Sequence, residues 1–219
     1  MCPYGLQPPA RYRMARFQTI PADIMHLLLQ AGYRRHGDIC YAMRCPTCRM
    51  CQPIRLDPRT FIPNRSQKRT LRGNNDLTIS QGPVQATQEK LNLLKKFFDL
   101  RYPGRDNTCD QYYQNFFNSR SGFTREILLH DNALLLGVAI VDLVAETFLN
   151  AVYFFFDPEA HRRSPGTFNI LNLLSLCSEQ GIHEFYLGYW LKEVRSMSYK
   201  ANFRPHELLT GDTWFRQGT

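Results

Sequence analysis

The sequence predicts an α+β protein, with a small cysteine-containing α/β subdomain first and a larger α+β domain second. The second half contains three β-rich segments in succession, and helical and strand patterns then alternate. Hydrophobic residues make up 43% of the 219 residues, so the chain can bury a sizeable core. We place the boundary between domains 1–80 and 81–219, because Gly82-Pro83 is typical of a linker.

Short strands and two helices are predicted for the first domain. The expected elements are a strand within 11–20, a helix from Pro21 to Gly32, short strands within 33–43, a strand at 53–56 and a helix over 65–72. The apolar face of the first helix is expected to hold Ile24, Leu27, Leu28 and Ala31. The second helix has Asn64 or Ser66 as its N-cap, and Gly73 ends it.

The second domain is predicted to start with two helices and then become a sheet. The expected order is helices over 86–100 and 109–118, strands at 125–130, 133–144 and 148–156, a helix from 166 to about 180, a strand at 184–187, a helix over 192–201 and a closing strand at 205–209. An antiparallel meander followed by helix, strand, helix and strand is the element order of a GNAT-like acyltransferase core. The fold class is therefore α+β with a GNAT-like second half.

The composition favours an anionic partner and a cytoplasmic protein. Lys and Arg exceed Asp and Glu by 27 to 19, which gives a net charge of +8. There is no run of about 18 apolar residues, so we expect no membrane span. The N-terminal residues lack a signal-peptide pattern. Cysteines in the cytoplasm stay reduced and are available as metal ligands.

Three cysteines lie three residues apart, which indicates a metal or iron–sulfur site. They are Cys45, Cys48 and Cys51, and Cys2 is the best candidate for a fourth ligand. Zinc sites usually come as two separated pairs of cysteines, so this spacing is closer to an iron–sulfur pattern, with zinc as the alternative. Such a centre could also be purely structural, because it would hold the N-terminus against the loop.

A basic segment follows the cysteines and predicts a nucleic-acid contact. Arg65, Lys68, Arg69 and Arg72 are spaced so that a helix gathers them on one face. A run of one charge is often only a solvated face. The interleaved Ser66 and Gln67 favour contacts to phosphate and sugar.

No nucleophile stands out among the motifs of the second half. The segment from Arg162 to Thr167 joins a strand end to a helix start, where backbone N–H groups can bind an anion or an acyl carbonyl. It holds one glycine, preceded by Pro165, so we expect no coenzyme A. Further along, Lys200 and Arg204 flank an aromatic residue and suit a rim of cations around an apolar slot.

Nine ordered motifs resemble the aminoacyl-tRNA–protein transferases, in particular the bacterial aspartate/glutamate leucyltransferase branch, related to eukaryotic arginyltransferase. The motifs are Gly32–Gly37, the Cys45–Cys51 cluster, Pro53–Arg55, Phe61–Arg69, Leu136–Asp142, Tyr153–Pro158, Arg163–Thr167, Tyr186–Trp190 and Tyr199–Pro205. The likeness spans nearly the whole chain. It departs from many relatives in starting its cysteine set at position 2 and in having Pro165 where a larger apolar residue is common.

The resemblance implies transfer of an amino acid from its tRNA ester to the N-terminal amine of a protein that begins with Asp or Glu, which marks that protein for degradation. It also implies that Cys2, Cys45, Cys48 and Cys51 hold an iron–sulfur cluster. An aminoacyl ester is already activated, so its aminolysis needs positioning and electrostatic stabilisation rather than a nucleophile.

Roles follow for the residues that match the motifs. As catalytic residues we expect Gly166 and Thr167 at the acyl carbonyl and Tyr153 or Asp142 at the amine. As substrate-binding residues we expect Arg65, Lys200, Arg204 and Tyr189, with the cations pairing the acidic side chain. As tRNA-binding residues we expect Lys68, Arg69, Arg72 and Arg163.

Two questions stay open at the level of the sequence. Leucine is the transferred residue by branch, and arginine is the alternative by wider kinship. The competing classes of function are a non-catalytic tRNA-binding module, which needs only the basic helix, and a coenzyme A-dependent acetyltransferase, which needs a richer glycine loop.

Overall fold

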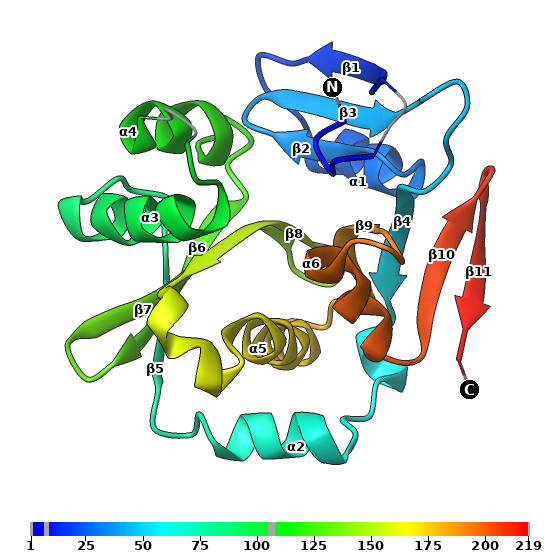
Figure 1. The fold of residues 1–219 in the computed structure, drawn as a ribbon. Coiled ribbons are helices and arrows are strands. Elements are labelled where there is room, and N and C mark those ends of the chain that lie inside the picture. The colour runs from blue at the N-terminus through cyan, green and yellow to red at the C-terminus, as the bar shows by residue number, and fades with distance from the viewer. Residues whose placement is uncertain (1, 7–8, 105–107, 219) are drawn as a thin grey trace.

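An eight-stranded sheet forms the centre of the molecule, and a three-stranded sheet lies at one end of it (Figure 1). The computed structural model describes residues 2–6, 9–104 and 108–218. Within these residues, no helix is both long enough and apolar enough to cross a bilayer.

The small sheet has the order β1-β3-β2 and is antiparallel throughout. Its strands are β1 (Tyr12–Arg16), β2 (Arg34–His36) and β3 (Ile39–Met43), and helix α1 (Ala22–Gln30) connects β1 to β2. The expected strands and helix are confirmed, but the expected apolar face of α1 is wrong. Met25 and Leu29 are buried, while Leu27 is 60% exposed, because the core lies on the side of the helix that carries Met25.

The large sheet has the order β11-β10-β4-β9-β8-β7-β6-β5. Its strands are β4 (Gln52–Leu56), β5 (Thr78–Gly82), β6 (Thr124–Asp131), β7 (Leu134–Val144), β8 (Phe148–Phe156), β9 (Glu184–Trp190), β10 (His206–Thr210) and β11 (Thr213–Gln217). Every neighbouring pair is antiparallel except β8 and β9, which are parallel. A meander followed by a parallel strand pair is the GNAT-like core that the element order predicts.

Helices cover both faces of the large sheet. Helix α5 (Pro165–Glu179) packs on the face that carries Ala139 and Leu149. Helix α3 (Gln88–Arg101) packs on the opposite face, and α1 packs on that same face against Phe148. The sheet is therefore buried on both sides along its central strands, as the apolar runs in β7 and β8 indicate.

The remaining helices are short or lie at the edge. They are α2 (Arg65–Arg72), α4 (Cys109–Tyr112), α6 (Arg195–Ser198), the π-helical turn η2 (Tyr113–Phe117) and the 3-10 turns η1 (Pro58–Thr60), η3 (Pro158–Arg163) and η4 (Tyr199–Asn202). Asn64 caps α2 through its side chain, and Gln67 completes a capping box, as the sequence predicts for the cap.

The two expected domains share one sheet. Strand β4 comes from the first 80 residues, yet it lies between β9 and β10 in the large sheet. Residue 80 itself lies inside β5, the edge strand at the other end of that sheet.

Candidate functional site

The parallel strands β8 and β9 pair over three residues and then diverge. The paired positions end at Asn150 and Tyr186. Beyond them, residues 151–156 of β8 pair on one side with β7, and residues 187–190 of β9 pair on one side with β4. Among the described residues, no strand lies between their facing edges, and we call this opening the split.

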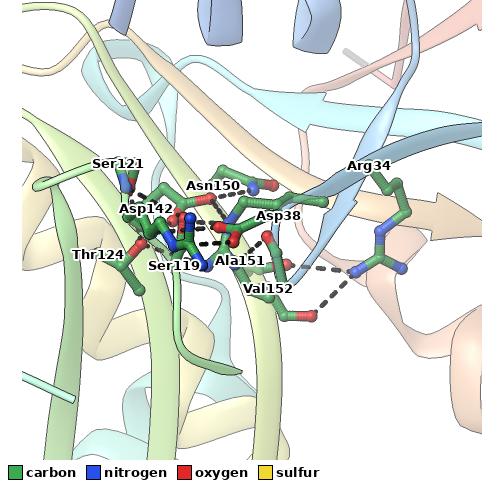
Figure 2. A network of polar contacts seen from close by, with 12 residues as sticks. Arg34, Asp38, Ser119, Ser121, Thr124, Asp142, Asn150, Ala151 and Val152 are labelled. Carbon is green, nitrogen blue, oxygen red and sulfur yellow. Dashed lines mark hydrogen bonds and ion pairs between the residues drawn. The ribbon is translucent and has the colours of Figure 1, made fainter. Parts of the chain in front are cut away.

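Arg34 enters the split from the small sheet. Its Nη2 donates to the carbonyl of Val152 at 3.1 Å and to that of Ala151 at 3.4 Å, both on the open edge of β8 (Figure 2). Its guanidinium also lies against Gly188, where a Cβ would overlap it. Gly188 has φ +81°, so the close approach and the backbone both require glycine.

Lys200 caps the opposite edge of the split. Its Nζ donates to the carbonyls of Leu187 at 2.7 Å and Tyr189 at 2.9 Å. Burial, followed by the charge of Arg34, lowers the pKa of Lys200 well below its usual value. The two cations therefore share one electrostatic environment, each held by backbone carbonyls of a different strand.

Tyrosines line the side of the split nearest the small sheet. The Tyr189 hydroxyl accepts from the backbone N–H of Met43 at 3.0 Å, and the guanidinium of Arg34 lies 5.7 Å from the Tyr189 ring centroid. Burial raises the pKa of Tyr189. Of the expected substrate-binding residues, the structure therefore brings Lys200 and Tyr189 together, and it adds Arg34.

The expected catalytic residue Asp142 lies inside a closed polar network. Its carboxylate accepts from Arg35 Nε at 2.8 Å, from Thr124 at 2.8 Å and from Asn150 Nδ2 at 2.9 Å (Figure 2). Asp142 and Arg35 have fully buried side chains. These contacts connect β2 to the large sheet and hold the strand that positions Arg34.

The other expected catalytic residues lie around β8 and the start of α5. Tyr153 belongs to the diverging part of β8, and its ring packs against that of Phe117, with 5.2 Å between the ring centroids. The Thr167 amide donates to the Ser164 carbonyl at 3.0 Å, so this N–H is already used within the helix start. A Cβ on Gly166 would meet the Tyr199 hydroxyl at 3.6 Å, which places Gly166 beside the turn that carries Lys200.

The cations expected to bind tRNA or the acceptor divide into two groups. Arg65, Lys68, Arg69 and Arg72 are exposed on α2, as predicted. Gln67 attaches this helix to η4 by donating to the Asn202 carbonyl at 3.2 Å. Arg163 instead pairs with Asp76 at 2.8 Å and Asp131 at 2.9 Å.

Arg204 is exposed, and its Nε donates to the carbonyl of Ala201 at 3.4 Å. It therefore lies outside the split, although Lys200 of the same motif lies within it.

The four expected ligand cysteines are neighbours. Burial raises the pKa of Cys51 to about 12, and the charges of Cys2, Cys48 and Cys45 add to this rise. Cys45 is buried, and its Sγ accepts from the backbone N–H of Arg11 at 3.5 Å. Among the residues with a described position, no three His, Cys, Asp or Glu side chains are arranged as a metal site.

Sequence reasoning missed Arg34 as a site residue. It passed over the pair Arg34-Arg35 inside a short strand, where consecutive side chains point to opposite faces. Both arginines are withdrawn from solvent, Arg35 toward Asp142 and Arg34 into the split. Two adjacent arginines in a strand between apolar segments are the signal that could have found them.

His36, the next residue of β2, makes the free energy of unfolding depend on pH. Burial, followed by the charges of Arg34 and Arg35, lowers the pKa of His36 from 6.5 to about 4. Between these values the unfolded chain binds a proton that the folded chain excludes, so the free energy of unfolding falls as the pH drops through this window. We expect a loss of about 1–3 kcal/mol, discounted for partial exposure.

Urea denaturation of the wild type and of His36→Gln, across this pH window, measures the effect. The variant should lose less stability on acidification than the wild type. Identical pH dependence of the two proteins would show that folding does not change the pKa of His36.

The chain matches two family models along most of its length. One describes the N terminus of the arginine-tRNA-protein transferases and matches residues 1–69, and the other describes their C terminus and matches residues 89–210. The chain belongs to the arginine-tRNA-protein transferase family. The resemblance in the sequence motifs is thus confirmed.

Curated members of this transferase family are similar over nearly the whole chain. An aspartate/glutamate leucyltransferase from Teredinibacter turnerae is 38% identical over 199 residues, which is 90% of this chain and 82% of that protein. One from Saccharophagus degradans is 36% identical over 205 residues, covering 90% of this chain and 84% of the relative.

A solved structure shares the fold at low identity. The C-terminal domain described as that of a putative lysylphosphatidylglycerol synthetase from Agrobacterium fabrum superimposes with a TM-score of 0.51 at 13% identity. The match covers 78% of this transferase chain and 52% of the other.

Proposed function

We propose that this chain transfers leucine from leucyl-tRNA to the N-terminal amine of proteins that begin with Asp or Glu. Eight relatives at 34–38% identity are named aspartate/glutamate leucyltransferases. The structural observation that supports this proposal is the split between β8 and β9. The buried Lys200 donates there to the carbonyl of Tyr189 on the open edge of β9. We assign the reaction to the cytoplasm, where aminoacyl-tRNA is made.

The reaction needs little covalent help from the protein. The neutral amine attacks the ester carbonyl carbon, an amide bond forms, the bond to the ribose oxygen breaks, and that oxygen takes up the proton that the amine loses. Backbone N–H groups beside the ester carbonyl favour the negative charge that develops on its oxygen. The backbone N–H of Gly166 is the candidate donor at the start of α5, because that of Thr167 is already bound to Ser164.

The exposed face of α2 is proposed to hold the tRNA. Within the described residues, none of its four cations pairs with a carboxylate, so the face keeps its full positive charge. The bond from Gln67 to η4 places this helix beside the turn that carries Lys200. A tRNA on α2 would thus approach the split from the side of α5.

Arg69→Gln together with Arg72→Gln is expected to weaken tRNA binding and its dependence on salt. The slope of log affinity against log salt should fall by about 0.7–0.9 for each phosphate that the variant no longer neutralises. Fluorescence anisotropy over a salt series measures this. Arg59→Gln is the matched control, because Arg59 is exposed nearby but already pairs with Asp57 at 2.9 Å; an unchanged slope in the double variant would contradict the assignment of α2.

We further propose that Cys2, Cys45, Cys48 and Cys51 hold an iron–sulfur cluster or a zinc ion. The chemistry of the donors supports this, since four neighbouring thiols favour a cation that removes the repulsion between their thiolates. When bound, the metal would join the N-terminal segment to the loop before β4. Visible absorbance of protein purified without oxygen, compared with Cys48→Ala, distinguishes the cluster from zinc and tests the ligands.

One assay tests the proposed reaction against its alternatives. Purified protein is given labelled leucyl-tRNA or arginyl-tRNA and peptides that begin with Asp, Glu or Ala. Leucine transfer without coenzyme A, much faster to the acidic peptides than to the Ala peptide, is the expected result. Transfer of arginine instead would show that arginyl-tRNA is the donor. Binding of tRNA without any transfer would indicate a non-catalytic tRNA-binding module.

A further inference from the structure

Two cations in the split have no carboxylate partner among the described residues. Neither Arg34 nor Lys200 takes part in an ion pair there. Three other cations withdrawn from solvent are paired: Arg35 with Asp142, Arg55 with Glu184 and Glu207, and Lys90 with Glu126. Arg34 and Lys200 differ from these three cations, because backbone carbonyls rather than carboxylates hold them.

In the part of the chain that the structure describes, these two cations contact uncharged groups. Arg34 donates to two backbone carbonyls of β8 and lies beside the ring of Tyr189. Lys200 donates to two backbone carbonyls of β9. Carbonyl dipoles offset part of the cost of burying a charge, but no carboxylate among the described residues compensates the charge of Arg34, and such a site favours a visiting anion.

The proposed reaction supplies an anion of the right kind. We propose that Arg34 binds the side-chain carboxylate of the acceptor's first residue, with Lys200 behind it, and that this cation pair selects acidic N-termini. The inference rests on the proposed function and names the residues that bind the first side chain of the acceptor. A planar guanidinium suits a carboxylate because it can donate two parallel hydrogen bonds.

Burial and position assign the direct contact to Arg34. Lys200 is 9% exposed, whereas Arg34 is half-buried. Arg34 comes from the small sheet, on the face opposite α5, so an acceptor at Arg34 and a tRNA at α2 would approach the split from different sides. Arg65 and Arg204 are exposed cations, and an exposed ion pair contributes too little to select one side chain over another.

The test compares acceptor peptides that differ only in charge. Leucine transfer is measured for peptides that begin with Asp or Asn, with wild-type protein and with Arg34→Gln. We expect kcat/KM for the Asp peptide to fall about 30-fold or more, because a charged partner is lost, while transfer to the Asn peptide stays where it was. Arg216 is an exposed arginine on β11, and Arg216→Gln should keep the wild-type ratio of kcat/KM for the Asp peptide to kcat/KM for the Asn peptide.

A loss of transfer to both peptides in equal proportion would overturn the proposal, because a merely structural role for Arg34 lowers both rates together. An unchanged ratio in a folded Arg34→Gln protein would overturn it as well. If wild-type protein transfers leucine to no peptide, the proposed function fails, and that outcome is separate from the ratio.

A second measurement uses wild-type protein and needs neither tRNA nor a folded variant. Phenylglyoxal modifies accessible arginines, and mass spectrometry of the fragment that contains Arg34 follows its rate. An Asp-leading peptide should slow modification of Arg34, and an Asn-leading peptide should not. Equal protection by both peptides, or by neither, would contradict carboxylate binding at Arg34.

Discussion

Asp142→Ala is expected to lower the free energy of unfolding by about 3–5 kcal/mol, because it leaves the buried guanidinium of Arg35 without its carboxylate. The pair is fully enclosed, and Thr124 and Asn150 donate to the same carboxylate. Loss of Asp142 thus leaves Arg35 Nε and Asn150 Nδ2 without an acceptor in a region closed to water. Urea denaturation at neutral pH measures the change.

A double variant separates structure from chemistry at this position. Arg35→Met with Asp142→Leu removes both charges and should regain most of the stability, since an apolar pair of similar volume often replaces a buried ion pair without loss. If this folded double variant transfers leucine, Asp142 acts by holding β2 in place. If Asp142→Ala keeps its stability and loses transfer, the amine-positioning role expected from the sequence would stand instead.

Gly188→Ala is expected to damage both stability and transfer. A Cβ there overlaps the guanidinium of Arg34, and φ is +81°. The strained backbone alone costs about 1–2 kcal/mol, and displacement of Arg34 removes its bonds to the carbonyls of Ala151 and Val152. We expect leucine transfer to fall about 100-fold, because a displacement of about 1 Å at a reacting site has that effect.

Gly211 provides the matched control. It also has a positive φ, +62°, but a Cβ there would meet nothing within 4 Å. Gly211→Ala should therefore lose about 1 kcal/mol from strain and keep its transfer activity. If both variants lose activity alike, or if neither does, the overlap at Gly188 has no role in the split.

Local patterns predicted most of the helices and strands. The helix at 65–72 has its expected bounds, because the sequence places capping residues at both ends, Asn64 and Gly73. The edge strands β5 and β11 were missed because their residues are mostly exposed and polar, so no apolar alternation marks them. Strand β9 extends to Trp190, beyond the predicted end at 187, because β4 pairs with its last residues.

The sequence alone determined the family, the order of the elements, the basic helix and the cysteine set, because motifs, caps and periodicity are local properties. The tertiary structure decided which charges are available for chemistry. It pairs Asp142 with Arg35 and Arg163 with Asp76, and it leaves Arg34 and Lys200 facing open strand edges. These outcomes depend on contacts between residues far apart in the chain, such as β2 with β8, and no local pattern of residues contains them.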